Sequence, residues 1–136
     1  MRIFLISSKR FYDRIPPIAE ELERLGHSVT LPNCYDDPGT EERFRALGAE
    51  EHGRWKASMI MHSLGIIQDS DAVLVLNFDK DGSKNYIGGA TFLEMYDAFR
   101  LGKKIYIYNP IPEGMLKDEI LGFQPVILEG NLARIA

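Results

Sequence analysis

A glycine-rich segment that ends in a glutamate has the residue types best suited to chemistry on a bound ligand. It is NYIGGATFLE, residues 85–94. The paired glycines let the backbone approach a ligand, and a carboxylate follows one helical turn later. If this helix start faces a cleft, Gly88, Gly89 and Thr91 would bind the ligand and Glu94 would react with it. The spacing also fits a capping box, in which Thr91 and Glu94 only cap their own helix, and spacing alone favours the cap.

A polar loop after the first predicted strand is a second candidate. Its residues are Ser7, Ser8, Lys9 and Arg10. Two hydroxyls, two cations and several backbone N–H groups close to a helix start suit a phosphate or another anion. The loop matches neither the P-loop pattern nor GxGxxG, so a solvated polar turn explains it equally well.

Amide and carboxylate side chains after two later strands extend this set. Asn77 and Asp79 follow the most apolar strand, and Asn109 follows the next one. We expect Asn77 and Asn109 to bind substrate, although a tight turn also explains Asn109, and Asp79 lies at the same edge of the sheet. Cys34 has no partner histidine in a motif, so an inert thiol is the simpler interpretation.

These candidates lie within a regular alternation of strands and helices. The patterns predict strands at residues 3–6, 28–31, 72–76, 104–108 and 126–128, and helices at 13–25, 41–68, 91–101 and 116–121, the second interrupted near Gly48 and Gly53. This order predicts an α/β fold, a flavodoxin-like or Rossmann-like three-layer sandwich with a five-stranded, mostly parallel sheet. In such sheets ligands bind beyond the carboxyl ends of the strands, where the candidate loops lie.

Length and composition limit what these residues can serve. The chain has 136 residues, which suits a single domain spanning residues 1–136. A net charge of −4 argues against a nucleic-acid polymer as partner, because neutralising its phosphates needs a surplus of Lys and Arg. One cysteine and three histidines offer no disulfide and no zinc-ligand spacing. No apolar run is long enough to cross a membrane, and the first one is too short for a signal peptide. We therefore expect a cytoplasmic protein with no metal, no cofactor and no membrane contact.

Three features together resemble the nucleoside 2-deoxyribosyltransferase-like superfamily, which includes deoxynucleoside monophosphate N-glycosidases. They are DAVLVL at residues 71–76, the glycine-rich loop before TFLE at 91–94, and LGKKI at 101–105. The resemblance covers nearly the whole chain, although its motifs are short. It implies a flavodoxin-like fold, assembly into homo-oligomers, and a helix glutamate, here Glu94, that attacks the anomeric carbon of a deoxyribonucleoside.

The chain departs from this family pattern at three positions. The family's general acid is a carboxylate eight residues before the aspartate that opens the central strand, and Ser63 stands there. Gly88 replaces an aspartate found in the transferases, and the tyrosine often found after the first strand is missing near Ser7. A general acid contributes about 10²- to 10⁴-fold, so its loss puts catalysis in doubt. Asp69 and Asp79 are the nearby substitutes. Capping or solvation at a strand start explains Asp69 better than catalysis does, whereas Asp79, at the cleft end of the strand, fits either role, and we expect it to be the second catalytic carboxylate.

Three functions remain open from the sequence. The first is cleavage or transfer of the N-glycosidic bond of a nucleoside or its monophosphate, with Glu94 as nucleophile. The second is a non-catalytic nucleotide-binding or interaction module that kept the fold and lost the acid. The third is an unrelated flavodoxin-like regulator in which Glu94 only caps its helix. A net acidic chain can bind a mononucleotide if a few cations and helix N-termini are focused in one cleft.

Overall fold

A five-stranded parallel sheet is the centre of the molecule. The computed structural model describes residues 1–136. The strands are β1 (Arg2–Ile6), β2 (Ser28–Thr30), β3 (Ala72–Val75), β4 (Lys104–Ile107) and β5 (Val126–Ile127). They lie in the order β2-β1-β3-β4-β5, and every neighbouring pair is parallel. This arrangement confirms the predicted flavodoxin-like α/β fold.

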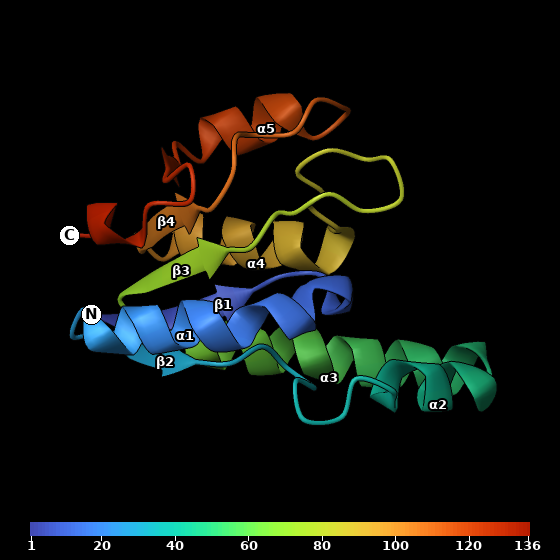
Figure 1. The fold of residues 1–136 in the computed structure, drawn as a ribbon. Coiled ribbons are helices and arrows are strands. Elements are labelled where there is room, and N and C mark those ends of the chain that lie inside the picture. Colours follow the sequence, from blue (N-terminus) through green and yellow to red (C-terminus); the bar gives the residue numbers. More distant parts are fainter.

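The helices cover both faces of the sheet. One face packs against α1 (Ile15–Arg24) and a C-terminal 3₁₀ helix, Leu132–Arg134, and the other against α3 (Ala49–Gln68), α4 (Gly89–Arg100) and α5 (Lys117–Gly122) (Figure 1). Two apolar cores result, one on each face. Alternate residues of one strand therefore belong to different cores, and all of β3 is buried, as the unbroken apolar run predicts.

One local prediction was wrong, and another was right only in part. The loop expected after β1 is a 3₁₀ helix, Lys9–Arg14, whose start is capped by the Ser8 hydroxyl. The expected interruption of the long helix occurs at Gly48, with a φ of 115°, which separates α2 (Thr40–Ala46) from α3. Gly53 does not interrupt α3. A glycine within a helix costs only about 1 kcal/mol, and a twenty-residue helix packed on a sheet tolerates that cost.

Two segments extend past the carboxyl ends of the strands. Figure 1 shows α2 and the N-terminal part of α3 reaching beyond the tips of β1 and β3 on one side of the sheet end, and the loop between β3 and α4 on the other side. This end of the sheet is where parallel α/β proteins bind ligands. None of the helices is both long and apolar enough to cross a membrane.

Candidate active site

A cavity of about 630 Å³ lies at the carboxyl end of the sheet. Its lining comes from the loop after β1, the loop after β2, α2, α3, the segment before α4 and the first turns of α4. The structure brings together seven of the predicted site residues in this lining, namely Ser7, Ser8, Lys9, Gly88, Gly89, Thr91 and Glu94. Four others, Arg10, Asn77, Asp79 and Asn109, do not line it.

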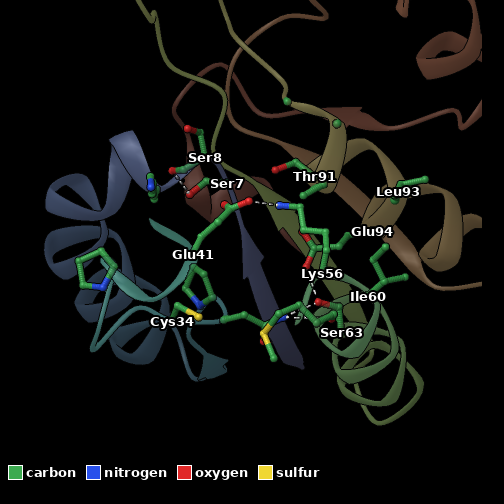
Figure 2. A pocket seen from close by; sticks show the side chains of 18 of the residues that line it. Ser7, Ser8, Cys34, Glu41, Lys56, Ile60, Ser63, Thr91, Leu93 and Glu94 are labelled. Atoms are coloured by element: carbon green, nitrogen blue, oxygen red, sulfur yellow. Dashed lines mark hydrogen bonds and ion pairs between the residues drawn. The ribbon is translucent and has the colours of Figure 1, made fainter. Parts of the chain in front are cut away.

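Glu94 is a half-buried carboxylate in this cavity. The Ser63 hydroxyl donates a hydrogen bond of 2.8 Å to its Oε2 atom, and Figure 2 shows the two side chains pointing toward each other. Burial raises the pKa of Glu94 to about 7; Asp97 raises it further, whereas the Ser63 hydrogen bond and the charge of Lys56 oppose the rise. The carboxyl therefore changes charge near neutral pH, as a catalytic group often does.

The capping box predicted from Thr91 and Glu94 is wrong. The helix α4 begins at Gly89, so Thr91 is already inside it and is buried. No side chain caps this helix, and Glu94 bonds to Ser63 instead of folding back. At Gly88 a Cβ atom would lie 3.2 Å from the phenol oxygen of Tyr86, so a larger residue there would require the Tyr86 ring to shift by a few tenths of an ångström.

A charged cluster joins α2 to α3 on another wall. The Glu41 carboxylate accepts hydrogen bonds from Lys56 at 2.8 Å and, with a suitable tautomer, His52 at 2.9 Å, and it pairs with Arg45 at 3.3 Å. Burial opposes ionisation of Glu41, but these partners outweigh it and lower its pKa to about 2. Figure 2 shows Glu41 and Lys56 meeting within the cavity. Glu41 is therefore a fixed anion at neutral pH and holds no proton to donate.

The two cations of the predicted anion-binding loop form ion pairs in different places. Ser7, Ser8 and Lys9 face the cavity, where the Lys9 ammonium contacts Glu42 at 3.1 Å. Arg10 instead forms a two-point salt bridge with Asp81, with N–O distances of 2.7 and 3.1 Å. Both partners of that second bridge are exposed.

The remaining predicted residues hold loops together. Asn77 is fully buried; its amide donates to the carbonyls of Asn109 and Pro110, both at 3.0 Å, and its side-chain oxygen accepts from Asn109 N–H at 2.9 Å. Asp79 accepts a hydrogen bond of 3.0 Å from the backbone of Asn85. These contacts fix the loops after β3 and β4 relative to each other and the shape of the loop that leads to α4.

An apolar wall completes the cavity. It consists of Pro32, Pro38, Trp55, Met59 and Ile60. The Trp55 ring is stacked on Phe44 of α2, with 5.7 Å between ring centroids, which holds the indole in place. A flat, fixed aromatic surface with charged groups nearby suits a planar heterocycle.

Several lining residues were not among the sequence candidates. They are Tyr12, Asn33, Glu41, Lys56, Ser63 as a hydrogen-bond donor, and Asp97. A signal existed for part of this set, because residues 56, 59, 60 and 63 have the spacing of one helix face. That α2 lies against this face depends on contacts between α2 and α3, such as Glu41 with Lys56, which no local pattern predicts.

Comparison with known proteins shows solved structures of similar fold. No family model matches the sequence, and no curated protein does. Among solved structures, the chain is similar to a 2-deoxyribosyltransferase from Bacillus psychrosaccharolyticus, with a TM-score of 0.55 and 22% identity over 85% of this chain and 77% of that one. It is also similar to the CMP N-glycosidase BcmB of Clostridium botulinum, with a TM-score of 0.55 and 16% identity over 93% and 85% of the two chains. At these identities the likeness is one of fold, and it confirms the fold that the resemblance implied.

Proposed function

We propose that the protein binds a nucleoside or its 5′-monophosphate in this cavity and cleaves or transfers the N-glycosidic bond, with Glu94 as nucleophile. The observation that carries the proposal is the Glu94 carboxylate, held by Ser63 within the cavity at the carboxyl end of the sheet. Two proteins of the same fold, a 2-deoxyribosyltransferase and a CMP N-glycosidase, act on bonds of this class and support it.

The chemistry needs the ionised form of Glu94. A carboxylate oxygen forms a bond to C1′ while the C1′–N bond breaks, and the base leaves with the electron pair of that bond. Water or a second base then displaces Glu94 from C1′, which gives hydrolysis or transfer. Positive charge develops on the sugar in both steps, and a nearby carboxylate stabilises it.

The walls of the cavity suggest how the rest of the substrate is held. The base would lie against the apolar wall around Trp55. The phosphate or 5′-hydroxyl would lie near Ser7, Ser8 and Lys9, opposite the start of α4 at Gly88 and Gly89. Helix N-termini and hydroxyls both bind anions well.

The proton that the leaving base requires has to come from a group other than the family's acid. Ser63 occupies that position, and Asp79 does not line the cavity. Lys56 and Asp97 do line it; Lys56 lowers the pKa of Glu94, and Asp97 raises it. We assign the proton donation to Lys56, whose ammonium is hydrogen-bonded to Glu41, or to solvent.

A direct assay tests this function. Purified protein would be incubated with deoxynucleosides and their monophosphates, with and without an acceptor base, and free and exchanged bases resolved by chromatography. We expect base release from at least one substrate, lost by a factor of about 10³ or more in Glu94→Gln. The control is Glu23→Gln on the exposed side of α1, which should keep full activity. Release that survives Glu94→Gln undiminished would remove Glu94 as nucleophile.

Ser63 in place of the acid favours a second candidate, a nucleotide-binding module without turnover. A ligand that binds only the folded state stabilises it by about 2.7 kcal/mol at a hundred times its Kd. This candidate therefore predicts a raised Tm with a nucleotide and no product. Turnover of any nucleoside or nucleotide would exclude it.

We also propose that the protein is a cytoplasmic homo-oligomer. Exposed apolar side chains on α4 (Leu93, Tyr96 and Phe99) continue onto Ile60 of α3, and two of them, Leu93 and Ile60, also line the cavity. A second copy packed on this surface would narrow the opening. Size-exclusion chromatography with light scattering measures the assembly, and a clean monomer would contradict it.

A further inference from the structure

We propose that Asn33 is a positioning residue for Glu94. Its side-chain amide donates a hydrogen bond to the Ser63 oxygen, and this directs the single hydroxyl hydrogen of Ser63 to the Glu94 carboxylate. The inference rests on the proposed role of Glu94 and adds how the carboxylate is aimed. It concerns residues on three separate segments, the loop after β2, α3 and α4.

Two hydrogen bonds link Asn33, Ser63 and Glu94 in series. Asn33 Nδ2 lies 2.6 Å from Ser63 Oγ, and Ser63 Oγ lies 2.8 Å from Glu94 Oε2. The second neighbour of Asn33 Nδ2 is the carbonyl oxygen of Met59 at 3.5 Å, an acceptor, so the amide nitrogen and not the amide oxygen faces α3. Ser63 itself is only 3% exposed, so its hydroxyl relies mainly on these protein partners.

Ser63 would otherwise have a different partner. A serine in a helix commonly donates to a backbone carbonyl three or four residues earlier. Ser58 of the same helix does so and donates to the Trp55 carbonyl at 2.7 Å. Ser63 does not, because Asn33 donates to its oxygen and approaches the Met59 carbonyl to which it would otherwise turn.

The position of Asn33 is itself fixed. The Tyr12 hydroxyl donates a hydrogen bond of 2.8 Å to the Asn33 carbonyl, and Pro32 just before it is buried. Burial, followed by the nearby Cys34 and Glu94, keeps the pKa of Tyr12 well above its usual value, so the phenol remains a donor at all physiological pH values.

The two carboxylate oxygens of Glu94 therefore have different surroundings. Oε2 accepts from Ser63, and no hydrogen bond reaches Oε1. No fully buried side-chain oxygen or nitrogen lacks a partner in this structure, so Oε1 is open to the cavity. The oxygen that is free to attack C1′ is thus held in place by a bond to the other one.

The test is a titration of Glu94 in the ligand-free protein, which does not depend on activity. The ¹³C NMR signal of its side-chain carboxyl, assigned by its loss in Glu94→Gln, reports the pKa directly. The ionisable groups that face it are Asp97 on α4, Lys56 on α3 with its partner Glu41 on α2, and Tyr12. All of them stay unchanged in the variants below.

We expect Ser63→Ala to raise the pKa of Glu94 by about one unit, because a hydrogen bond to the charged form is lost. Asn33→Ala should raise it by about half a unit, because the Ser63 hydroxyl is then free to turn to Met59. In the Ser63→Ala background, Asn33→Ala should add no further shift, as expected for residues that act as one chain. His62→Ala, exposed and next to Ser63 on α3, is the control and should leave the titration unchanged.

Asn33→Leu keeps most of the side-chain volume without the donor and replaces Asn33→Ala if the latter perturbs the fold. The proposal is overturned if both Asn33 variants titrate like the native protein while Ser63→Ala does not, or if the Asn33 shift persists in full without Ser63. A protein that releases no base but shows these shifts would contradict the proposed function and leave the positioning role intact. Base release without these pKa shifts would support the proposed function and contradict the positioning role of Asn33.

Discussion

Ser63 and Glu94, 31 residues apart in the chain, are joined by a hydrogen bond of 2.8 Å that connects α3 to α4 at the floor of the cavity. At the position where the family pattern has an acid, this chain has a neutral donor, and the glutamate that the pattern makes a nucleophile is its acceptor. The bond stabilises the charged form of a carboxyl that burial otherwise keeps protonated.

Glu94 should make stability depend on pH. Its pKa rises from 4.5 to about 7 on folding, so between these values the folded protein keeps a proton that the unfolded chain has lost. Its contribution is fully present below pH 4.5 and is lost as the pH rises to about 7. Glu94→Gln removes this dependence, and its free energy of unfolding should gain on the order of 2 kcal/mol relative to the native protein between pH 4.5 and 8. Urea denaturation across that range measures the difference, and parallel curves would contradict the burial of this carboxyl.

Lys56 should help to keep Glu94 ionised. Its positive charge lowers the pKa of Glu94, so Lys56→Met should move the acidic limb of the pH–rate profile upward by roughly half a unit, while Lys56→Arg should move it little. If Lys56 also donates the proton to the base, Lys56→Met should lower kcat by about 10²-fold or more at all pH values. An unchanged limb and an unchanged kcat together would exclude both roles.

Ser63→Asp should test whether the missing acid limits the rate. The introduced carboxyl would lie beside Oε2 of Glu94, and two carboxyls at that distance retain one proton between them near neutral pH. That proton could be delivered to the leaving base, so base release should rise by about 10- to 100-fold below pH 7. Ser63→Asn has a similar shape without the proton and is the matched control. Equal rates in the two variants would show that proton delivery does not limit turnover.

Asn77 should matter for stability and not for binding. Asn77→Ala empties the site of a fully buried side chain and leaves two carbonyls and one N–H group of the loop after β4 without their partner, which should cost about 2 kcal/mol. Asn131→Ala, which removes only an exposed cap of the C-terminal 3₁₀ helix, should cost about 1 kcal/mol or less. Chemical denaturation compares the two, and nucleotide affinity of the folded protein should be unchanged in both.

Phe99 should mark the surface between copies. It is 48% exposed on α4, and Phe99→Asp should convert the expected oligomer to monomers at micromolar concentration, because it places a charge within an apolar contact. Met115→Asp changes a side chain that is 92% exposed elsewhere, and this variant should keep the native assembly. The same elution volume for all three proteins would place the contact on a different surface.

The fold could be predicted from the sequence because its signals are local. The apolar run of β3 and the glycines that end the helices need no knowledge of distant residues; Gly26 and Gly102, with φ values of 94° and 68°, follow the ends of α1 and α4. The long helix was harder to divide, because Gly48 and Gly53 look alike in sequence and only the first has a φ that other residues avoid.

Only part of the candidate site could be predicted from the sequence. The loops after β1 and before α4 were expected there because their glycines, hydroxyls and Glu94 are chemically distinctive. Arg10 and Asp79 looked equally suitable, yet each bonds a group of the loop after β3, Asp81 for Arg10 and the Asn85 backbone for Asp79. The capping box was wrong for a similar reason: Thr91-x-x-Glu94 is the right pattern, but the N-cap of α4 is Gly88, three residues before Thr91. Partner choice among exposed charges depends on tertiary distances that spacing does not encode.

The order of segments around the cavity divides the protein into two unequal parts. Every lining residue lies at or before Asp97, whereas β4, α5 and β5 contribute none. The chain after Asp97 therefore builds part of the sheet and of its two cores but none of the cavity wall. Substitutions after Asp97 should therefore affect ligand binding only by changing how many molecules are folded, whereas substitutions of the lining residues should also change how each folded molecule works.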